Sequence, residues 1–112
     1  MRMNAVEISV ILYQEDNHWI AQGLEYDITA QSPTLPELRE RFAAKVAAEI
    51  AISMDLGREP LEGIDPAPRN FWRMFEDAKM TIEAEQPPFA IQGGFAAPRI
   101  VSRMKVGQLE VA

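Results

Sequence analysis

The stretch SPTLPEL, residues 32–38, decides the fold of this chain because it marks the start of a helix. The Thr34 hydroxyl is placed to accept a hydrogen bond from the backbone N–H of Glu37. The Glu37 carboxylate is placed to accept one in return from the backbone N–H of Thr34. Pro36 falls in the first turn, where the missing N–H of proline is not needed. This reciprocal pair, a capping box, predicts that a helix begins here.

The residues after the capping box continue the helical pattern. Apolar side chains recur at every fourth position and form one stripe, while charged residues lie mostly off it. Gly57 follows the stripe and suits the left-handed conformation that often closes a helix. The predicted helix is about 30 Å long, enough to cover one face of a three- or four-stranded sheet. The stripe consists of Leu38, Phe42, Val46, Ile50 and Met54.

In three segments before the capping box, apolar residues recur at every second position, as they do in strands with one buried face. They cover residues 6–13, 19–22 and 26–31. The polar residues 15–18 predict a hairpin turn, whose type stays open because no Asn-Gly or Asp-Gly pair is present. The three segments are therefore predicted to form an antiparallel meander.

The chain after Gly57 predicts a loop, a second helix and weaker strands. Residues 58–68 carry three prolines and indicate a surface loop, in which a short edge strand is left open. Asp65 is a candidate N-cap, so a short second helix is predicted from about Pro66 to Ala78. Residues 81–85 alternate like a short strand.

These elements predict an α+β protein with an antiparallel three- or four-stranded sheet, one long helix packed on it and a short second helix. Residues 1–86 are predicted to form one α+β domain. Residues 87–112 form a C-terminal extension, partly strand or mobile, because Gly93-Gly94 and Pro98 interrupt it.

Composition and charge narrow the classes of function. The 112 residues include no cysteine, which excludes disulfides and thiolate chemistry and is typical of a reducing compartment. No apolar run reaches the length of a signal sequence or a membrane span, so we expect a soluble cytoplasmic protein. Residues 1–86 hold 8 Lys and Arg against 16 Asp and Glu, a net charge of −8, and residues 87–112 carry +2. This acidic body disfavours nucleic acid, and it suits either a basic protein partner or plain solubility.

A resemblance to a known family is carried by residues 18–22 (HWIAQ), 24–27 (LEYD), 29–31 (TAQ) and 34–38 (TLPEL). Together they resemble the HicB-like family, over about residues 5–56. The resemblance implies a βββα core of ferredoxin-like or double-stranded-RNA-binding-like shape that commonly forms a homodimer. It also implies an antitoxin that binds and covers a small ribonuclease toxin. Many relatives add a DNA-binding domain, for which residues 87–112 are too short.

Candidate catalytic and metal-binding residues each have a simpler interpretation. His18 lies in a predicted turn without a second histidine or a cysteine, which favours a surface residue. Glu25 and Asp27 offer oxygen ligands for a divalent cation, yet paired carboxylates are common on exposed turns. The serines lack a nucleophile-elbow context, and Gly93-Gly94 does not precede a helix with a lysine. We therefore expect no enzyme activity, no catalytic residue, no metal and no cofactor.

Aromatic residues give the candidate partner-binding site. Tryptophan and its neighbours are enriched where protein interfaces are strongest, although packing of the second helix on the sheet is the better explanation for three of these residues. Three functions stay open: a protein-binding regulatory module that neutralises a small toxin or nuclease, a stand-alone accessory or structural dimer, and a small ligand-binding protein. The candidate site residues are Trp19, Tyr26, Phe71, Trp72 and Phe75.

Overall fold

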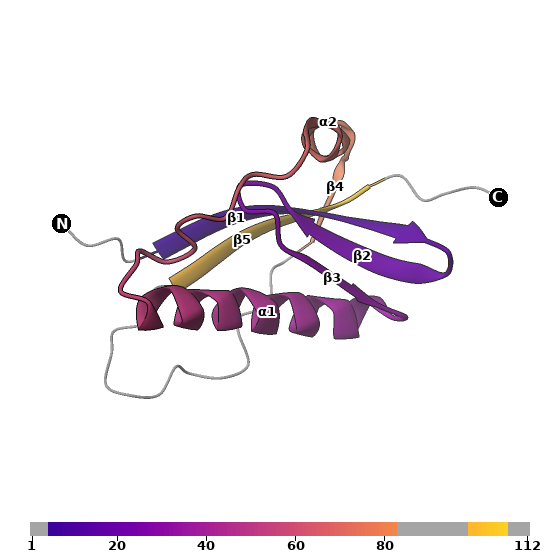
Figure 1. Ribbon diagram of the computed structural model, residues 1–112. Helices are drawn as coiled ribbons and strands as arrows, with labels where there is room; N and C mark the ends of the chain where they lie inside the picture. The colour runs from indigo at the N-terminus through magenta and orange to yellow at the C-terminus, as the bar shows by residue number, and fades with distance from the viewer. Residues whose placement is uncertain (1–4, 83–98, 108–112) are drawn as a thin grey trace.

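The computed structural model describes residues 5–82 and 99–107, in which one sheet lies between two helices. The long helix runs along one face of the sheet, and the short helix crosses the opposite face (Figure 1). The strand order in the sheet is β3-β2-β1-β5-β4. The elements are β1 (Ala5–Glu15), β2 (His18–Gly23), β3 (Thr29–Ser32), α1 (Leu35–Asp55), α2 (Arg69–Asp77), β4 (Met80–Ile82) and β5 (Arg99–Val106).

The α+β class, the long helix and the short second helix are confirmed, but the prediction of an antiparallel three- or four-stranded sheet is only partly right. β1, β2 and β3 form the expected antiparallel meander. The sheet has five strands and is mixed, because β5 pairs parallel to β1 from Ala5↔Arg99 to Leu12↔Val106. Two parallel strands are joined by a long connection and not by a tight turn, so no turn motif in the sequence indicates that they pair.

The hairpin between β1 and β2 closes through a two-residue loop. Glu15 pairs with His18. Asp16 and Asn17 between them have φ of 51° and 64°. Positive φ at both central residues is the signature of a type I′ turn, the form that matches the twist of the flanking strands. Aspartate and asparagine tolerate this conformation better than most residues, which settles the turn type that the sequence left open.

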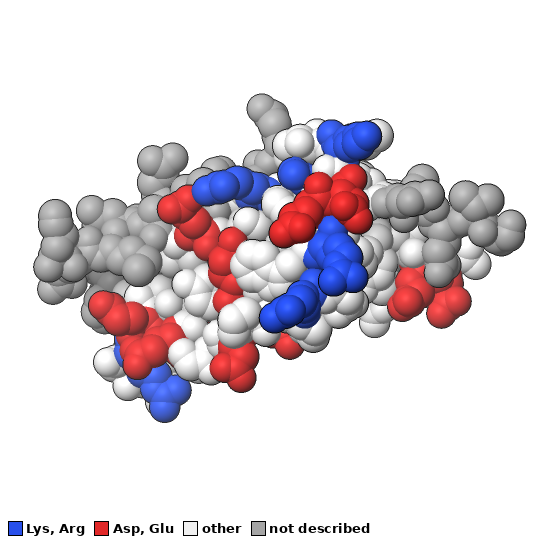
Figure 2. Space-filling view, turned by 90° about the horizontal axis from the view of Figure 1, so that it is seen from above, with Lys and Arg blue, Asp and Glu red and all other residues white. Residues whose placement is uncertain are grey.

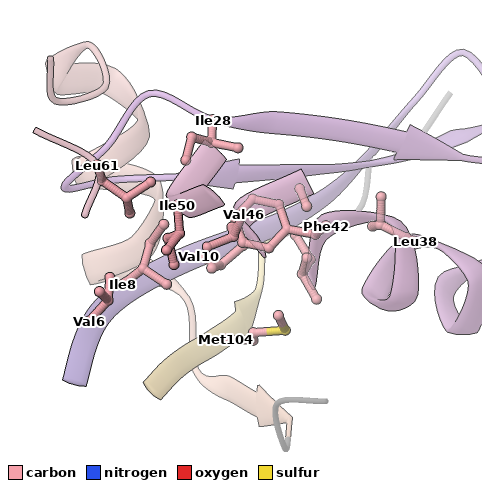
Figure 3. Close-up of a cluster of buried hydrophobic side chains, with 12 residues drawn as sticks. Val6, Ile8, Val10, Ile28, Leu38, Phe42, Val46, Ile50, Leu61 and Met104 are labelled. Carbon is pink, nitrogen blue, oxygen red and sulfur yellow. The ribbon is translucent and has the colours of Figure 1, made fainter. Parts of the chain in front are cut away.

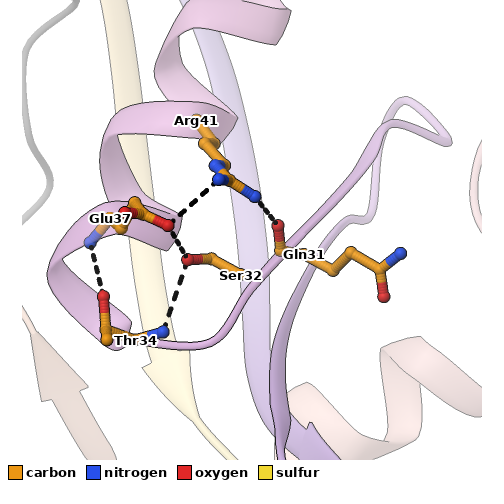
Figure 4. A network of polar contacts seen from close by, with 5 residues as sticks. All are labelled: Gln31, Ser32, Thr34, Glu37 and Arg41. Atoms are coloured by element: carbon orange, nitrogen blue, oxygen red, sulfur yellow. Dashed lines mark hydrogen bonds and ion pairs between the residues drawn. The ribbon is translucent and has the colours of Figure 1, made fainter.

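The start of α1 uses the predicted cap with one correction. Thr34 Oγ1 accepts from the Glu37 N–H at 3.4 Å, as expected. The Glu37 carboxylate does not reach the Thr34 N–H, since Ser32 stands between them (Figure 4). The buried Ser32 hydroxyl donates to Glu37 Oε2 at 2.8 Å and accepts from the Thr34 N–H at 3.3 Å. The Ser32 hydroxyl therefore links the two halves of the box, and the Arg41 guanidinium pairs at 3.0 Å with the same Glu37 Oε2 that accepts from Ser32.

The main core lies between α1 and the sheet, and it uses the predicted stripe (Figure 3). Four of the five stripe residues are buried, and Met54 is half-buried at the edge of the cluster. Gly57 has φ of 72°, which confirms the left-handed residue after the helix. The buried side chains of this core belong to Val6, Ile8, Val10, Leu12, Ala21, Ile28, Leu38, Phe42, Val46, Ile50, Leu61 and Met104.

The predicted starts of α2 and β3 are wrong. α2 begins at Arg69 rather than Pro66, because Pro68 disfavours the helical conformation at the residue before it. The carbonyl of Asp65, the expected N-cap, accepts from the Asp27 N–H at 2.7 Å instead. That bond also removes Asp27 from strand pairing, so β3 begins at Thr29 and not at Tyr26.

The loop at 58–68 forms turns and no edge strand. Of the strand predicted at 81–85, residues 81 and 82 belong to β4 and the rest lies outside the described residues. In the part of the chain that the structure covers, neither helix is long and apolar enough to cross a membrane.

Candidate functional site

The inner side of α2 packs on the sheet face opposite α1. Ile11 and Leu24 are buried beneath it. The ring of Tyr13 stacks on Phe71 with 6.1 Å between centroids and an interplanar angle of 29°. Lys105 Nζ lies 4.5 Å from the centroid of the Phe75 ring. The same ammonium group donates a hydrogen bond to the backbone carbonyl oxygen of Phe75 at 3.4 Å. Phe71 and Phe75 are therefore used to attach α2 to the sheet.

The Tyr13 hydroxyl is affected by this packing. Burial raises its pKa above the ordinary value of 10.0, and the nearby Glu15 carboxylate raises it further. Both causes disfavour the charged phenolate, so Tyr13 keeps its proton at neutral pH.

The outer side of α2 carries a surface depression of about 630 Å³, the α2 pocket, lined by Ala67, Arg69, Trp72, Arg73 and Glu76. Trp72 is half-buried in it, and its indole Nε1–H donates to the Ala67 carbonyl at 3.1 Å. The Ala67 N–H in turn donates to the Leu24 carbonyl at 2.8 Å, which ties the pocket wall to the sheet. The indole is thus oriented by a hydrogen bond within the protein, which also satisfies its polar group.

The two arginines of the α2 pocket have no partner among the residues that the structure describes. Both are exposed, and neither guanidinium is hydrogen-bonded or ion-paired to another residue within 5–82 and 99–107. In Figure 2, which looks onto the face carrying α2, basic and acidic groups lie beside one another near the centre of the view. Positions 69, 73 and 76 follow the i, i+4, i+7 spacing of one helix face, a signal in the sequence that pointed to this site and was missed.

The five predicted partner-binding residues do not form one surface. Trp19 and Tyr26 pack, half-buried, against the core on the α1 side of the sheet. Phe71, Trp72 and Phe75 lie on the opposite side, around α2. Of the five, Trp72 lines the α2 pocket.

The carboxylates considered as metal ligands are committed to internal hydrogen bonds. Glu25 accepts from both the backbone N–H and the hydroxyl of Ser9, at 2.6 and 2.9 Å. Asp27 accepts from Gln22 Nε2 at 2.8 Å. β2 ends at Gly23, so the Glu25 side chain, and not a β2 backbone carbonyl, accepts the hydrogen bond from the Ser9 N–H of β1. Among the described residues, no three His, Cys, Asp or Glu side chains are grouped so as to hold a metal ion.

The single histidine stays at the surface. His18 is exposed at the start of β2, and its Nδ1 lies 3.1 Å from the Asp16 carbonyl oxygen. The Nδ1–H tautomer donates to that oxygen and so supports the hairpin turn.

The outer edge of β3 is covered by two basic side chains of α1. Arg41 donates to the Gln31 carbonyl at 3.0 Å, and Lys45 donates to the Thr29 carbonyl at 2.8 Å. Cations over an edge strand oppose the addition of a further strand. The β3 edge is therefore a poor docking surface, which leaves the α2 pocket as the better candidate.

Comparisons with known proteins add no relative. The chain matches no protein-family model, no curated protein and no solved structure.

Proposed function

We propose that this protein is a regulatory module that binds another protein stoichiometrically, as the HicB antitoxins that it resembles do, and so neutralises a small toxin or nuclease. The observation that carries the proposal is the α2 pocket, in which a pre-oriented Trp72 stands beside two guanidinium groups that pair with no other residue in the described part of the chain. The module acts by covering its partner, so it needs no catalytic group of its own.

The chemistry of the α2 pocket suits protein binding. Tryptophan and arginine are the side chains most often found at the centre of strong protein interfaces. Fixing the indole in advance reduces the entropy lost on association, because fewer rotamers remain to be frozen. The hydrogen bond to Ala67 supplies this fixation here.

The charge of the chain favours a basic partner in the cytoplasm. The net charge of −6 attracts a small basic protein and speeds its encounter, and it repels nucleic acid. The lack of cysteine suits a reducing compartment, where we place the complex.

A homodimer that acts without a toxin is the second candidate function. Ile52 and Leu56 lie one turn apart near the end of α1, with 55% and 60% of their surface exposed. An exposed apolar pair favours self-association. Light scattering distinguishes the two states, since a monomer has a mass of 12.6 kDa. A dimer that becomes monomeric in Leu56→Glu supports this candidate, and a monomer in the wild type excludes it.

Affinity capture from the native host tests the antitoxin proposal. We expect one small basic protein in equimolar amount, whose nuclease activity disappears when one equivalent of this chain is added back. Trp72→Ala is expected to weaken the complex, while Arg58→Gln, remote from the α2 pocket, serves as the control. The absence of any stoichiometric partner would overturn the proposal.

A further inference from the structure

The charged residues of the α2 pocket follow a definite order along the helix. Arg69 and Arg73 come first and Glu76 comes last, so the charges read positive, positive, negative from the amino end of α2. A helix rises 1.5 Å per residue, which separates the two ends of this series by about 10 Å. The helix dipole has the same sense, with its positive end beside Arg69.

Several other cations of the described chain are used inside the fold, whereas Arg58 and Lys79 are exposed and make no contact of this kind with another described residue. Arg41 and Lys45 bind carbonyls of β3, and Lys105 binds the carbonyl of Phe75. Arg103 pairs with Glu7 at 2.9 Å. The two arginines of the α2 pocket flank a fixed aromatic ring and bind no other residue within 5–82 and 99–107.

We infer that the α2 pocket binds a short segment of the partner protein in which acidic residues are followed by apolar residues and then a basic one. The inference rests on the proposed function and adds the chemistry of the segment that is bound. The charges of such a segment are the reverse of those along α2.

Each group in the segment meets a matching group on α2. A guanidinium binds a carboxylate through two parallel N–H···O bonds, so Arg69 and Arg73 take the acidic residues. The apolar residues cover the Trp72 ring, whose N–H is already satisfied. The basic residue of the segment pairs with Glu76, a carboxylate that would repel a phosphate backbone. The order of charges and the net charge of −6 therefore favour a peptide over a nucleic acid.

A peptide titration followed by NMR tests the inference on the full chain. The probe is a capped peptide of sequence Glu-Glu-Leu-Leu-Lys, compared with Gln-Gln-Leu-Leu-Lys and Lys-Lys-Leu-Leu-Lys. The protein has two tryptophans, so the Trp72 indole N–H signal is assigned by its loss in Trp72→Phe. We expect the glutamate peptide to shift this signal and the α2 amides in a saturable way, and the two control peptides to bind about tenfold more weakly or worse.

Arg73→Gln is expected to weaken binding of the glutamate peptide by about tenfold, while Arg58→Gln, with the same change of charge outside the pocket, leaves it unchanged. Equal binding of the glutamine peptide, or full binding to Arg73→Gln, would overturn the inference. So would a single-stranded oligouridylate that shifts the same signals more strongly than the peptide.

Failure of this inference and failure of the proposed function can be told apart. If the wild type and Arg69→Gln/Arg73→Gln capture the same partner equally well, the function stands and the inference is wrong. If no partner is captured, the function fails, and the peptide titration still decides the chemistry of the α2 pocket.

Discussion

Gly23 fixes the turn between β2 and β3. The chain folds back so closely here that a Cβ at Gly23 would lie 2.7 Å from the Tyr26 carbonyl oxygen and 2.9 Å from Ile8 Cδ1. The Gly23 N–H also donates to the Ile28 carbonyl at 2.8 Å, which closes the turn. Only a residue without a side chain fits this close approach of two backbone segments.

Gly23→Ala is therefore expected to lower the free energy of unfolding by about 1–3 kcal/mol, because backbone has to move to accept the methyl group. Gly107→Ala is the matched control, since its Cβ would lie no closer than 3.4 Å to a neighbour. Urea denaturation of both variants measures the difference. Equal stabilities of the two variants would contradict the argument.

Tyr13 gives the protein a pH dependence in the alkaline range. Burial, with the Glu15 carboxylate, raises its pKa in the folded state above the value in the unfolded chain. The folded state then holds the proton more tightly, so this contribution to stability is fully present below about pH 10 and is lost as pH rises through the folded-state pKa.

We expect the wild type to lose more stability than Tyr13→Phe between about pH 9 and pH 11. Phenylalanine keeps the ring that stacks on Phe71 and removes the titrating hydroxyl. Glu15→Gln should give an intermediate slope. Denaturation curves at a series of pH values measure these slopes, and identical slopes for the wild type and Tyr13→Phe would exclude the effect.

At the scale of single elements, α1 is determined by its own sequence more than any other part of the chain. Its cap, its apolar stripe and its closing glycine all lie within residues 32–57. The stripe meets the sheet along the whole helix, so most of its stabilisation comes from packing.

Phe42→Ala tests that packing. Phe42 is 1% exposed at the centre of the main core, so its truncation is expected to lower the free energy of unfolding by about 3–5 kcal/mol. Ile52→Ala removes an apolar side chain from the exposed side of the same helix and should change stability by less than about 0.5–1 kcal/mol. Thermal melts compare the two, and a melting temperature of Phe42→Ala within a few degrees of the wild type would contradict the role of this residue.

At the scale of the whole molecule, β5 brings the last described residues beside β1, which contains the first ones. It lies inside the sheet, parallel to β1 on one side and antiparallel to β4 on the other. Met104 enters the main core, and Lys105 holds the carbonyl of Phe75 on the opposite face. Both layers of the protein therefore depend on this strand.

Truncation before Arg99 should abolish cooperative unfolding, because it exposes an edge of β1 and opens the main core. Truncation after Gly107 keeps all of β5 and the bond from the Gly107 N–H to the Leu12 carbonyl, and it is expected to leave the fold intact. Circular dichroism during urea titration separates the two outcomes. A cooperative transition in the shorter protein would show that β5 is dispensable.

The candidate site was predictable only in part. The Phe71, Trp72 and Phe75 cluster was visible as an apolar helix face. All three side chains pack against the same buried cluster, but the sequence did not show that Trp72 also lines the α2 pocket. The place of Trp72 depends on its hydrogen bond to the Ala67 carbonyl, and the Ala67 N–H in turn donates to the Leu24 carbonyl. Trp19 and Tyr26 were grouped with this cluster by residue type alone, whereas the structure puts them on the other side of the sheet.

By itself, the sequence determined the β1–β2–β3 meander, α1 and its cap, because these depend on alternation, helical periodicity and hydrogen bonds between residues close in the chain. Only the tertiary structure decided that Ser32 relays the SPTLPEL cap, that α2 starts at Arg69, and that β5 enters the sheet beside β1. The reason is the range of the interactions. A cap or a stripe is encoded within a few turns, whereas a parallel pairing between residues 5–12 and 99–106 exists only once the rest of the sheet has brought them together.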